Sequence, residues 1–204
     1  MNIAAQQPPP VIVLAGGASR RFGRDKLTTV VAGRPLLEWT LHLLGAVEIV
    51  LVTRDSPDVI RIGHQWGARV VVAARAELGM AHSIVAGFAA LTDGEAGAVI
   101  TLGDDPLAAR ALPEVMAAAA ATPTELVAVR RSPPVPHPVY VPRSCWALIA
   151  PPADGVADHG LRALLGDTTT WVETAQESAP VDLDADVDVA VIEAALLRLA
   201  PPSR

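Results

Sequence analysis

Basic side chains and glycines gather in one stretch near the start of the chain. After the apolar run at residues 11–14 the sequence reads Ala-Gly-Gly-Ala-Ser-Arg-Arg-Phe-Gly-Arg-Asp-Lys and ends at Lys26. Glycines let the backbone turn tightly and approach a ligand closely. Successive N–H groups, arginine forks and a lysine ammonium all suit phosphate oxygens. The stretch therefore predicts a triphosphate-binding loop, although an ordinary exposed basic turn after a strand would have a similar composition.

Two common phosphate-binding motifs do not match this stretch. A Walker loop requires lysine directly after its last glycine, but Gly23 is followed by Arg24 and Asp25. A dinucleotide fingerprint requires G-x-G-x-x-G, and Gly16, Gly17 and Gly23 do not have that spacing. We therefore expect a third type of nucleotide site.

Carboxylates gather at a second place, where they could hold a divalent metal ion. Asp104 and Asp105 follow the apolar run at residues 99–102. A carboxylate at the C-terminal end of a parallel strand faces the ligand crevice, and Mg²⁺ prefers one or two carboxylates together with phosphate oxygens. Asp105 fits equally well as a cap for the helix that begins after it.

A third cluster, also acidic, lies near the end of the chain, between Asp182 and Asp188. Alternation along a strand puts Asp182 and Asp184 on the same face. Asp186 and Asp188 fit the cap and first turn of the last helix, where the helix dipole favours negative charge.

Short β-branched runs alternate with helical patterns, and these elements must position the charged residues. The runs at 11–14, 49–52, 70–72 and 99–102 are continuous and do not alternate with polar residues, as in strands buried on both faces. Runs at 126–129 and 139–141 add two strands, the second short and antiparallel. We expect helices at 35–44, 58–66, 81–91, 113–121 and 186–199, with two short ones near 143–150 and 160–165. The alternation predicts a three-layer α/β fold on a doubly wound, mostly parallel sheet.

Composition excludes several classes of protein. The chain has 204 residues, of which 51% are hydrophobic, so it is not disordered as a whole. Its 22 acidic and 16 basic residues give a net charge of −6, and only 3% are aromatic, which argues against nucleic-acid partners. A single cysteine, Cys145, cannot form an internal disulfide. No secretory signal or membrane-spanning run is visible, so we expect a cytoplasmic protein without a membrane partner.

The first loop resembles a family signature. L-A-G-G-A-S-R-R-F-G-R-D-K is similar to L-A-G-G-x-S-x-R-M-G-x-D-K of the MobA-like nucleotidyltransferases, with Phe22 in place of methionine. These enzymes transfer a nucleotide to molybdopterin during molybdenum cofactor maturation. The resemblance implies a Rossmann-like nucleotidyltransferase fold of the nucleotide-diphospho-sugar transferase type. It also implies one domain over residues 11–200, after a disordered tail at 1–10.

The resemblance implies roles for residues of the loop and of the acidic segments. Arg21, Lys26 and Asp104 form the catalytic set, with Arg21 and Lys26 neutralising charge on the triphosphate and on the leaving pyrophosphate. Mg²⁺ is held by Asp104 and by Asp182 or Asp184, with the register between these two left open. The residues expected at the nucleotide are Leu14, Ala15, Gly16, Gly17, Ser19, Arg21, Lys26, Gly79 and Ser83.

Gly79 and Ser83 belong to a segment, 79–87, that resembles the cytidylyltransferase branch and implies contact with the base; His82 either contacts ribose or is merely exposed. Segments 137–140 and 158–162 resemble the border of that branch's acceptor pocket. There His137 and Arg162 either meet a pterin phosphate or are ordinary surface residues. These three segments favour CTP, whereas the L-A-G-G start of the first loop is similar to the guanylyltransferases and favours GTP. Both nucleotides therefore remain open.

The resulting hypothesis is transfer of CMP or GMP from a nucleoside triphosphate to molybdopterin, with release of pyrophosphate and with a molybdoenzyme as a further partner. One alternative keeps the chemistry and changes the acceptor to a sugar phosphate or another phosphorylated alcohol. Another is a non-catalytic nucleotide-binding partner of a molybdoenzyme. A reductase is a further alternative, but no dinucleotide fingerprint supports it.

Overall fold

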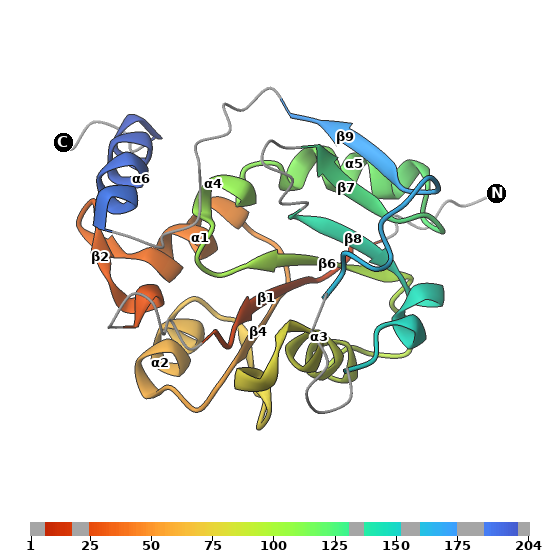
Figure 1. Ribbon diagram of the computed structural model, residues 1–204, viewed down its shortest axis with the longest axis horizontal. Helices are drawn as coiled ribbons and strands as arrows, with labels where there is room; N and C mark the ends of the chain where they lie inside the picture. Colours follow the sequence, from red (N-terminus) through yellow and green to blue (C-terminus); the bar gives the residue numbers. More distant parts are fainter. Residues whose placement is uncertain (1–6, 18–24, 131–136, 152–159, 175–185, 200–204) are drawn as a thin grey trace.

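Seven strands form the central sheet of the computed structural model, which describes residues 7–17, 25–130, 137–151, 160–174 and 186–199 (Figure 1). The strand order is β5-β4-β1-β6-β8-β7-β9. The strands are β1 (Val11–Ala15), β4 (Ile49–Thr53), β5 (Arg69–Val72), β6 (Gly97–Leu102), β7 (Val127–Arg130), β8 (Val139–Pro142) and β9 (Thr170–Glu173).

The sheet is mostly parallel, which confirms the predicted fold class. β5, β4, β1 and β6 pair in parallel, and so do β7 and β9. β8 runs antiparallel to both of its neighbours, β6 and β7, so the prediction of a short antiparallel strand at 139–141 is also confirmed. The C-terminal ends of the parallel strands β4, β1 and β6 therefore lie side by side, and we refer to this place as the C-terminal edge of the sheet.

Helices cover both faces of this sheet. The α-helices are α1 (Leu36–Leu44), α2 (Pro57–Gln65), α3 (Met80–Ala89), α4 (Pro106–Ala109), α5 (Leu112–Ala121) and α6 (Asp186–Leu199). Three 3₁₀ helices, η1 (Lys26–Thr28), η2 (Ala76–Leu78) and η3 (Arg143–Leu148), and a hairpin of β2 (Val30–Val31) and β3 (Arg34–Pro35) complete the described elements. None of the helices in the described part of the chain is long and apolar enough to cross a membrane.

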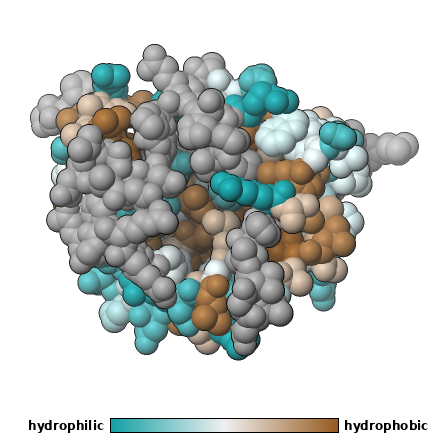
Figure 2. All heavy atoms as spheres, in the orientation of Figure 1, coloured by the Kyte–Doolittle hydropathy of each residue, from teal (hydrophilic) through white to brown (hydrophobic). Residues whose placement is uncertain are grey.

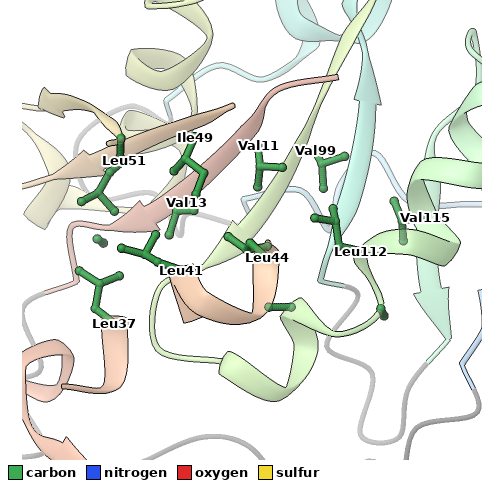
Figure 3. Close-up of a cluster of buried hydrophobic side chains, with 14 of the residues drawn as sticks. Val11, Val13, Leu37, Leu41, Leu44, Ile49, Leu51, Val99, Leu112 and Val115 are labelled. Carbon is green, nitrogen blue, oxygen red and sulfur yellow. The ribbon is translucent and has the colours of Figure 1, made fainter. Parts of the chain in front are cut away.

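Each central strand buries side chains on both faces, as its unbroken apolar sequence predicts. Val11 and Val13 of β1 belong to one buried cluster with Leu41 and Leu44 of α1, which Val115 of α5 extends (Figure 3). The alternate residues of β1 face the other way and pack with α3, for example against Ile84. A pair of hydrophobic layers therefore fixes β1 and, with it, the point from which the first loop leaves the sheet.

α2 shows how a helix at the surface of this fold divides its residues. Val59 and Ile62 are buried, whereas Asp58, Arg61 and Gln65 are exposed. Hydrophilic residues accordingly line the lower left edge of the molecule in Figure 2, where Figure 1 places α2. Arg61 bonds to both exposed partners within the helix, so it makes an ordinary surface ion pair.

α6 closes a separate hydrophobic cluster with the β2–β3 hairpin. Ile192 and Leu196 of α6 are buried against Val31 and Trp39, and the two elements lie together on the left of Figure 1. The Trp39 indole donates a hydrogen bond of 2.7 Å to the Val31 carbonyl oxygen. This cluster ties the end of the described chain to the segment that follows η1.

Several expected elements differ from the structure. The short helix expected near 143–150 is present as the 3₁₀ helix at 143–148. Residues 160–164 form turns in place of the second short helix, because Gly160 has a left-handed φ of +52° and too few residues follow to support an α-helix. β5 is half exposed, since it lies at the edge of the sheet. Pro10, the last residue of the expected disordered tail, is buried, and its carbonyl oxygen accepts a 2.9 Å hydrogen bond from the Val99 amide.

Candidate functional site

Gly16, the first residue after β1, is placed by close packing against η2 and the start of α3. A Cβ atom on Gly16 would lie 2.6 Å from Cβ of Ala76 and 3.1 Å from Oγ of Ser83. Only a glycine lets the backbone pass so close to these side chains. Gly17 is exposed, and a Cβ there would meet nothing within 4 Å. Gly16 is therefore required by packing, whereas Gly17 leaves backbone open toward the solvent.

Lys26 and Asp104 form an ion pair across the ends of two strands. Lys26 begins η1, Asp104 follows β6, and Nζ of the lysine lies 3.0 Å from Oδ2 of the aspartate. The lysine side chain is only 11% exposed and the aspartate side chain 29% exposed. The pair therefore couples the predicted phosphate-binding lysine to the predicted metal ligand in a site that solvent screens only in part.

The turn that carries Asp104 is held by the backbone of Gly103. Its amide donates to the Leu14 carbonyl oxygen at 2.9 Å, and its carbonyl oxygen accepts from the Thr40 hydroxyl at 2.8 Å. Asp105 points elsewhere. It is buried, and its Oδ1 accepts a 2.9 Å hydrogen bond from the Ala108 amide, so it caps α4. Of the two roles open to Asp105 in the sequence, the structure shows the helix cap.

A cavity of about 340 Å³ opens beside this ion pair, and we call it the glycine-loop cavity. Lys26 is the one cationic side chain among the described residues that line it. Its lining residues are Leu14, Ala15, Gly16, Gly17, Lys26, Leu27, Ala76, Glu77, Gly79, Met80, Ser83, Leu102 and Asp104. The fold thus brings together residues from the first loop, the start of α3 and the end of β6 that the sequence predicted as one site.

Some predicted site residues lie outside the described part of the chain. These are Ser19 and Arg21 of the first loop and Asp182 and Asp184 of the acidic segment. Within the described residues, no group of three or more His, Cys, Asp or Glu side chains could hold a metal ion. Asp104 is thus the predicted metal ligand whose geometry the structure provides.

The two predicted acceptor residues are placed differently from each other. His137 is only 5% exposed, and its Nδ1 lies 3.4 Å from the Ile100 carbonyl oxygen, so it is not a surface residue. Arg162 is exposed. Neither lines the glycine-loop cavity. Gly160, however, packs against Met80, since a Cβ there would lie 2.9 Å from the methionine sulfur. The segment that begins at Gly160 therefore lies beside the rim of the cavity.

His82 lies on α3 between the cavity residues Met80 and Ser83 but does not itself line the cavity. It is partly buried, and its Nδ1 has no hydrogen-bond partner in the described structure. The expectation that it is simply exposed is therefore wrong, and a contact with ribose stays a prediction.

The sequence did not predict a second ion pair, which lies at the C-terminal edge of the sheet near Lys26. Asp25 accepts a 2.7 Å hydrogen bond from Arg54, which follows β4 directly. The signal that could have found it is the position of Arg54, immediately after an apolar run and so at the same edge of the sheet as Gly16.

A larger cavity, of about 490 Å³, lies around the N-terminal ends of β1 and β6, away from these residues. Its described lining includes Glu95, Met116 and Tyr140 but no lysine or arginine, so it lacks a cation for a triphosphate. Tyr140 donates a 2.9 Å hydrogen bond to the Pro123 carbonyl oxygen, and burial raises the pKa of its phenol above the ordinary value. If the nucleotide site were chosen by cavity volume alone, this larger cavity would be chosen although its described lining has no cation for a triphosphate.

Solved structures share this fold at low sequence identity. A Mycobacterium tuberculosis Rv0371c homolog from Mycobacterium sp. strain JC1 has a TM-score of 0.77 and 22% identity, covering 95% of this chain and 98% of its own. A manganese complex of Mycobacterium tuberculosis Rv0371c has a TM-score of 0.65 and 21% identity, covering 90% and 96%. Molybdopterin-guanine dinucleotide biosynthesis protein A from Archaeoglobus fulgidus has a TM-score of 0.67 and 17% identity, covering 93% and 99%. No curated protein sequence matches the chain closely enough to count as a relative.

The mostly parallel sheet and these structural neighbours define an α/β, Rossmann-like fold of the nucleotidyltransferase type. The family model described as "MobA-like NTP transferase domain" matches residues 11–174. The chain therefore belongs to the MobA-like NTP transferase family.

Proposed function

We propose that this nucleotidyltransferase transfers CMP or GMP from CTP or GTP to molybdopterin in a magnesium-dependent reaction that releases pyrophosphate. The observation that carries the proposal is the Lys26–Asp104 pair at the wall of the glycine-loop cavity. It puts a cation for phosphate oxygens and a carboxylate for a metal ion at the same edge, directly beside backbone freed by Gly17.

Residues of the glycine-loop cavity bind and orient the nucleotide in this proposal. Backbone N–H groups at Gly16 and Gly17 and the Lys26 ammonium suit the phosphates. Gly79 and Ser83, at the start of α3, lie on the same cavity wall and suit the nucleoside. Arg21 is proposed to share the charge of the β- and γ-phosphates with Lys26.

Asp104 fits a divalent metal ion. Its carboxylate lines the cavity, keeps 29% exposure and presents the hard oxygen ligand that Mg²⁺ prefers. Asp182 or Asp184 is proposed as the second ligand. Mg²⁺, when bound, neutralises negative charge on phosphate oxygens.

The chemistry requires alignment more than proton transfer. An oxygen of the acceptor phosphate attacks the α-phosphorus of the nucleotide, a new P–O bond forms, and the bond between the α-phosphorus and the bridging oxygen breaks. Both electrons of that bond leave with pyrophosphate. A phosphate monoester has a second pKa near about 6 and is mostly dianionic at neutral pH, so no strong general base is needed. Lys26 would hold the leaving phosphates in line while the loop keeps the α-phosphorus in place.

The acceptor is proposed to lie on the side of the cavity where Gly160 packs against Met80. Arg162, two residues further on, is exposed and carries the charge that a pterin phosphate would meet. His137 is buried beside Ile100 of β6, and it is proposed to support the acceptor side of the site from that position.

The test is pyrophosphate release from CTP, GTP, ATP and UTP in the presence of Mg²⁺, with and without molybdopterin. We expect release with CTP or GTP that depends on molybdopterin and stops when EDTA removes the metal. If pyrophosphate is released only with a sugar phosphate or another phosphorylated alcohol, that compound is the acceptor in place of molybdopterin. Nucleotide binding without release under any of these conditions would favour a non-catalytic partner of a molybdoenzyme.

A further inference from the structure

Asp25, the residue before Lys26, is fixed by a separate donor on each carboxylate oxygen. Oδ1 accepts a 3.1 Å hydrogen bond from the Leu27 amide and so caps η1. Oδ2 accepts a 2.7 Å hydrogen bond from the Arg54 guanidinium. Because η1 begins at Lys26, the orientation of Asp25 also sets the direction in which the lysine leaves the backbone.

Arg54 starts from a rigid position. It follows Thr53, the last residue of β4, which pairs in register with Ala15 of β1. The Thr53 hydroxyl also donates a 3.2 Å hydrogen bond to the Ala15 carbonyl oxygen. Arg54 therefore leaves the sheet beside Gly16, at the beginning of the loop, and reaches Asp25, at its end.

Four charged residues thus form a series from the end of β4, past the start of η1, to the end of β6. Arg54 extends from β4 to Asp25, and Lys26 extends to Asp104 at the end of β6. Positive and negative charges alternate along this series. If Asp104 turns to a metal ion, the bond between Arg54 and Asp25 still holds the start of η1.

The Arg54–Asp25 pair differs from a surface ion pair of the same type. The side chains of Arg54 and Asp25 are 33% and 21% exposed and lie 2.7 Å apart, whereas those of Arg61 and Asp58 are 56% and 71% exposed and lie 3.3 Å apart. Less exposed charges are screened less by water and salt. The Arg54 pair can therefore hold a geometry that the Arg61 pair cannot.

We propose that Arg54 is a positioning residue of the nucleotide site: through Asp25 it fixes the start of η1 and aims Lys26 at the polyphosphate. This inference rests on the proposed function. It assigns no contact between Arg54 and the nucleotide.

The experiment measures Kd for the Mg²⁺ complex of the preferred nucleotide in Arg54→Gln, Arg54→Lys, Asp25→Asn and the double variant Asp25→Asn/Arg54→Gln. Arg61→Gln is the matched control, because it removes the same charge from an exposed pair. Asp25→Asn keeps an amide oxygen for the Leu27 amide and loses only the charge toward Arg54. It also carries the test if Arg54→Gln does not fold.

We expect Arg54→Gln and Asp25→Asn each to raise Kd about tenfold, the effect of one charge-assisted hydrogen bond, with a smaller change in kcat. Arg54→Lys restores part of the loss, and Arg61→Gln leaves Kd unchanged. The double variant is no worse than either single variant, because both break one contact. A purely structural role would lower the melting temperature without changing Kd where the variants are folded, and that result would overturn the proposal.

Three further results would also overturn it. If the two single effects add in the double variant, Arg54 acts on the phosphates independently of Asp25. If all variants bind nucleotide as the wild type does, the inference fails and the proposed function stands. If the wild type itself binds no nucleoside triphosphate, the proposed function fails and the inference falls with it.

Discussion

Replacing Asp104 by asparagine removes one negative charge and keeps the shape of the side chain. In the structure this charge lies 3.0 Å from the Lys26 ammonium. Exposed ion pairs contribute up to about 1 kcal/mol, and breaking a buried pair costs about 3–5 kcal/mol. With a mostly buried lysine and a partly exposed aspartate, we expect Asp104→Asn to lower the free energy of unfolding by about 1–2 kcal/mol. For a chain of this length that corresponds to a melting temperature lower by about 2–8 °C.

The effect of Asp104→Asn on catalysis should be far larger than its effect on stability. An amide is a weaker ligand for Mg²⁺ than a carboxylate and carries no charge. We expect the rate of pyrophosphate release to fall by at least about 10²–10³-fold, the usual loss when one preorganised electrostatic contact is removed. The assay is a coupled measurement of pyrophosphate with saturating nucleotide and Mg²⁺, at a temperature where thermal unfolding shows both proteins folded.

The neighbouring residue offers a matched control for this variant. Asp105→Asn makes the same chemical change one position later, and asparagine caps a helix as well as aspartate does. We expect it to keep the wild-type rate. Wild-type pyrophosphate release in Asp104→Asn would refute the metal role, and an equal loss in Asp105→Asn would refute the division of labour between the two side chains.

Six further variants test the packing and charges of the structure. Thr101→Val should raise the free energy of unfolding in urea by about 1 kcal/mol, because the buried Thr101 hydroxyl has no hydrogen-bond partner in the described structure, whereas Thr53→Val should lower it by about 1 kcal/mol. Gly16→Ala should cost about 1–3 kcal/mol and weaken nucleotide binding in thermal-shift assays, while Gly17→Ala should keep the wild-type melting temperature. Burial raises the pKa of the Tyr140 phenol above its ordinary value of 10.0. The contribution of this neutral phenol to the free energy of unfolding is therefore complete below pH 10.0 and is lost as the pH rises through the raised pKa. Tyr140→Phe should remove this loss of stability, as measured by urea denaturation at alkaline pH. Lys26→Met should bind Mn²⁺ more tightly than the wild type in calorimetry without nucleotide, because the ammonium no longer competes for Asp104, and should bind nucleotide more weakly.

The central strands were predictable because their sequences are continuous runs of mostly apolar, β-branched residues. β1 and β4 are buried at all five of their positions, as expected of a central strand that is covered on both faces. The β2–β3 hairpin was not predictable, because its turn puts Ala32 at a φ of +46°, which alanine rarely adopts. β9 was missed as well, since its strand character depends on pairing with β7, about forty residues earlier in the chain.

The same distinction between local and distant contacts applies to the candidate site. Gly16, Lys26 and Asp104 could be predicted because each lies in a short motif directly after an apolar run. The contact between Arg54 and Asp25 joins residues 29 positions apart, and it exists because β4 lies next to β1 in parallel. No local pattern contains that neighbour relation, so the sequence could indicate which strands form but not which side chains meet at their ends.

In the proposed function, the Lys26–Asp104 pair makes each residue a tethered competitor for the other's ligand. A tether of this kind acts at a high effective concentration, which a free ion in solution must overcome by mass action. A metal ion alone would take Asp104 away from Lys26, and a polyphosphate alone would take Lys26 away from Asp104. A metal–nucleotide complex would exchange this one ion pair for two new ones, between Lys26 and phosphate and between Asp104 and the metal ion. The proposed site would therefore favour the complex of the two ligands over either ligand alone.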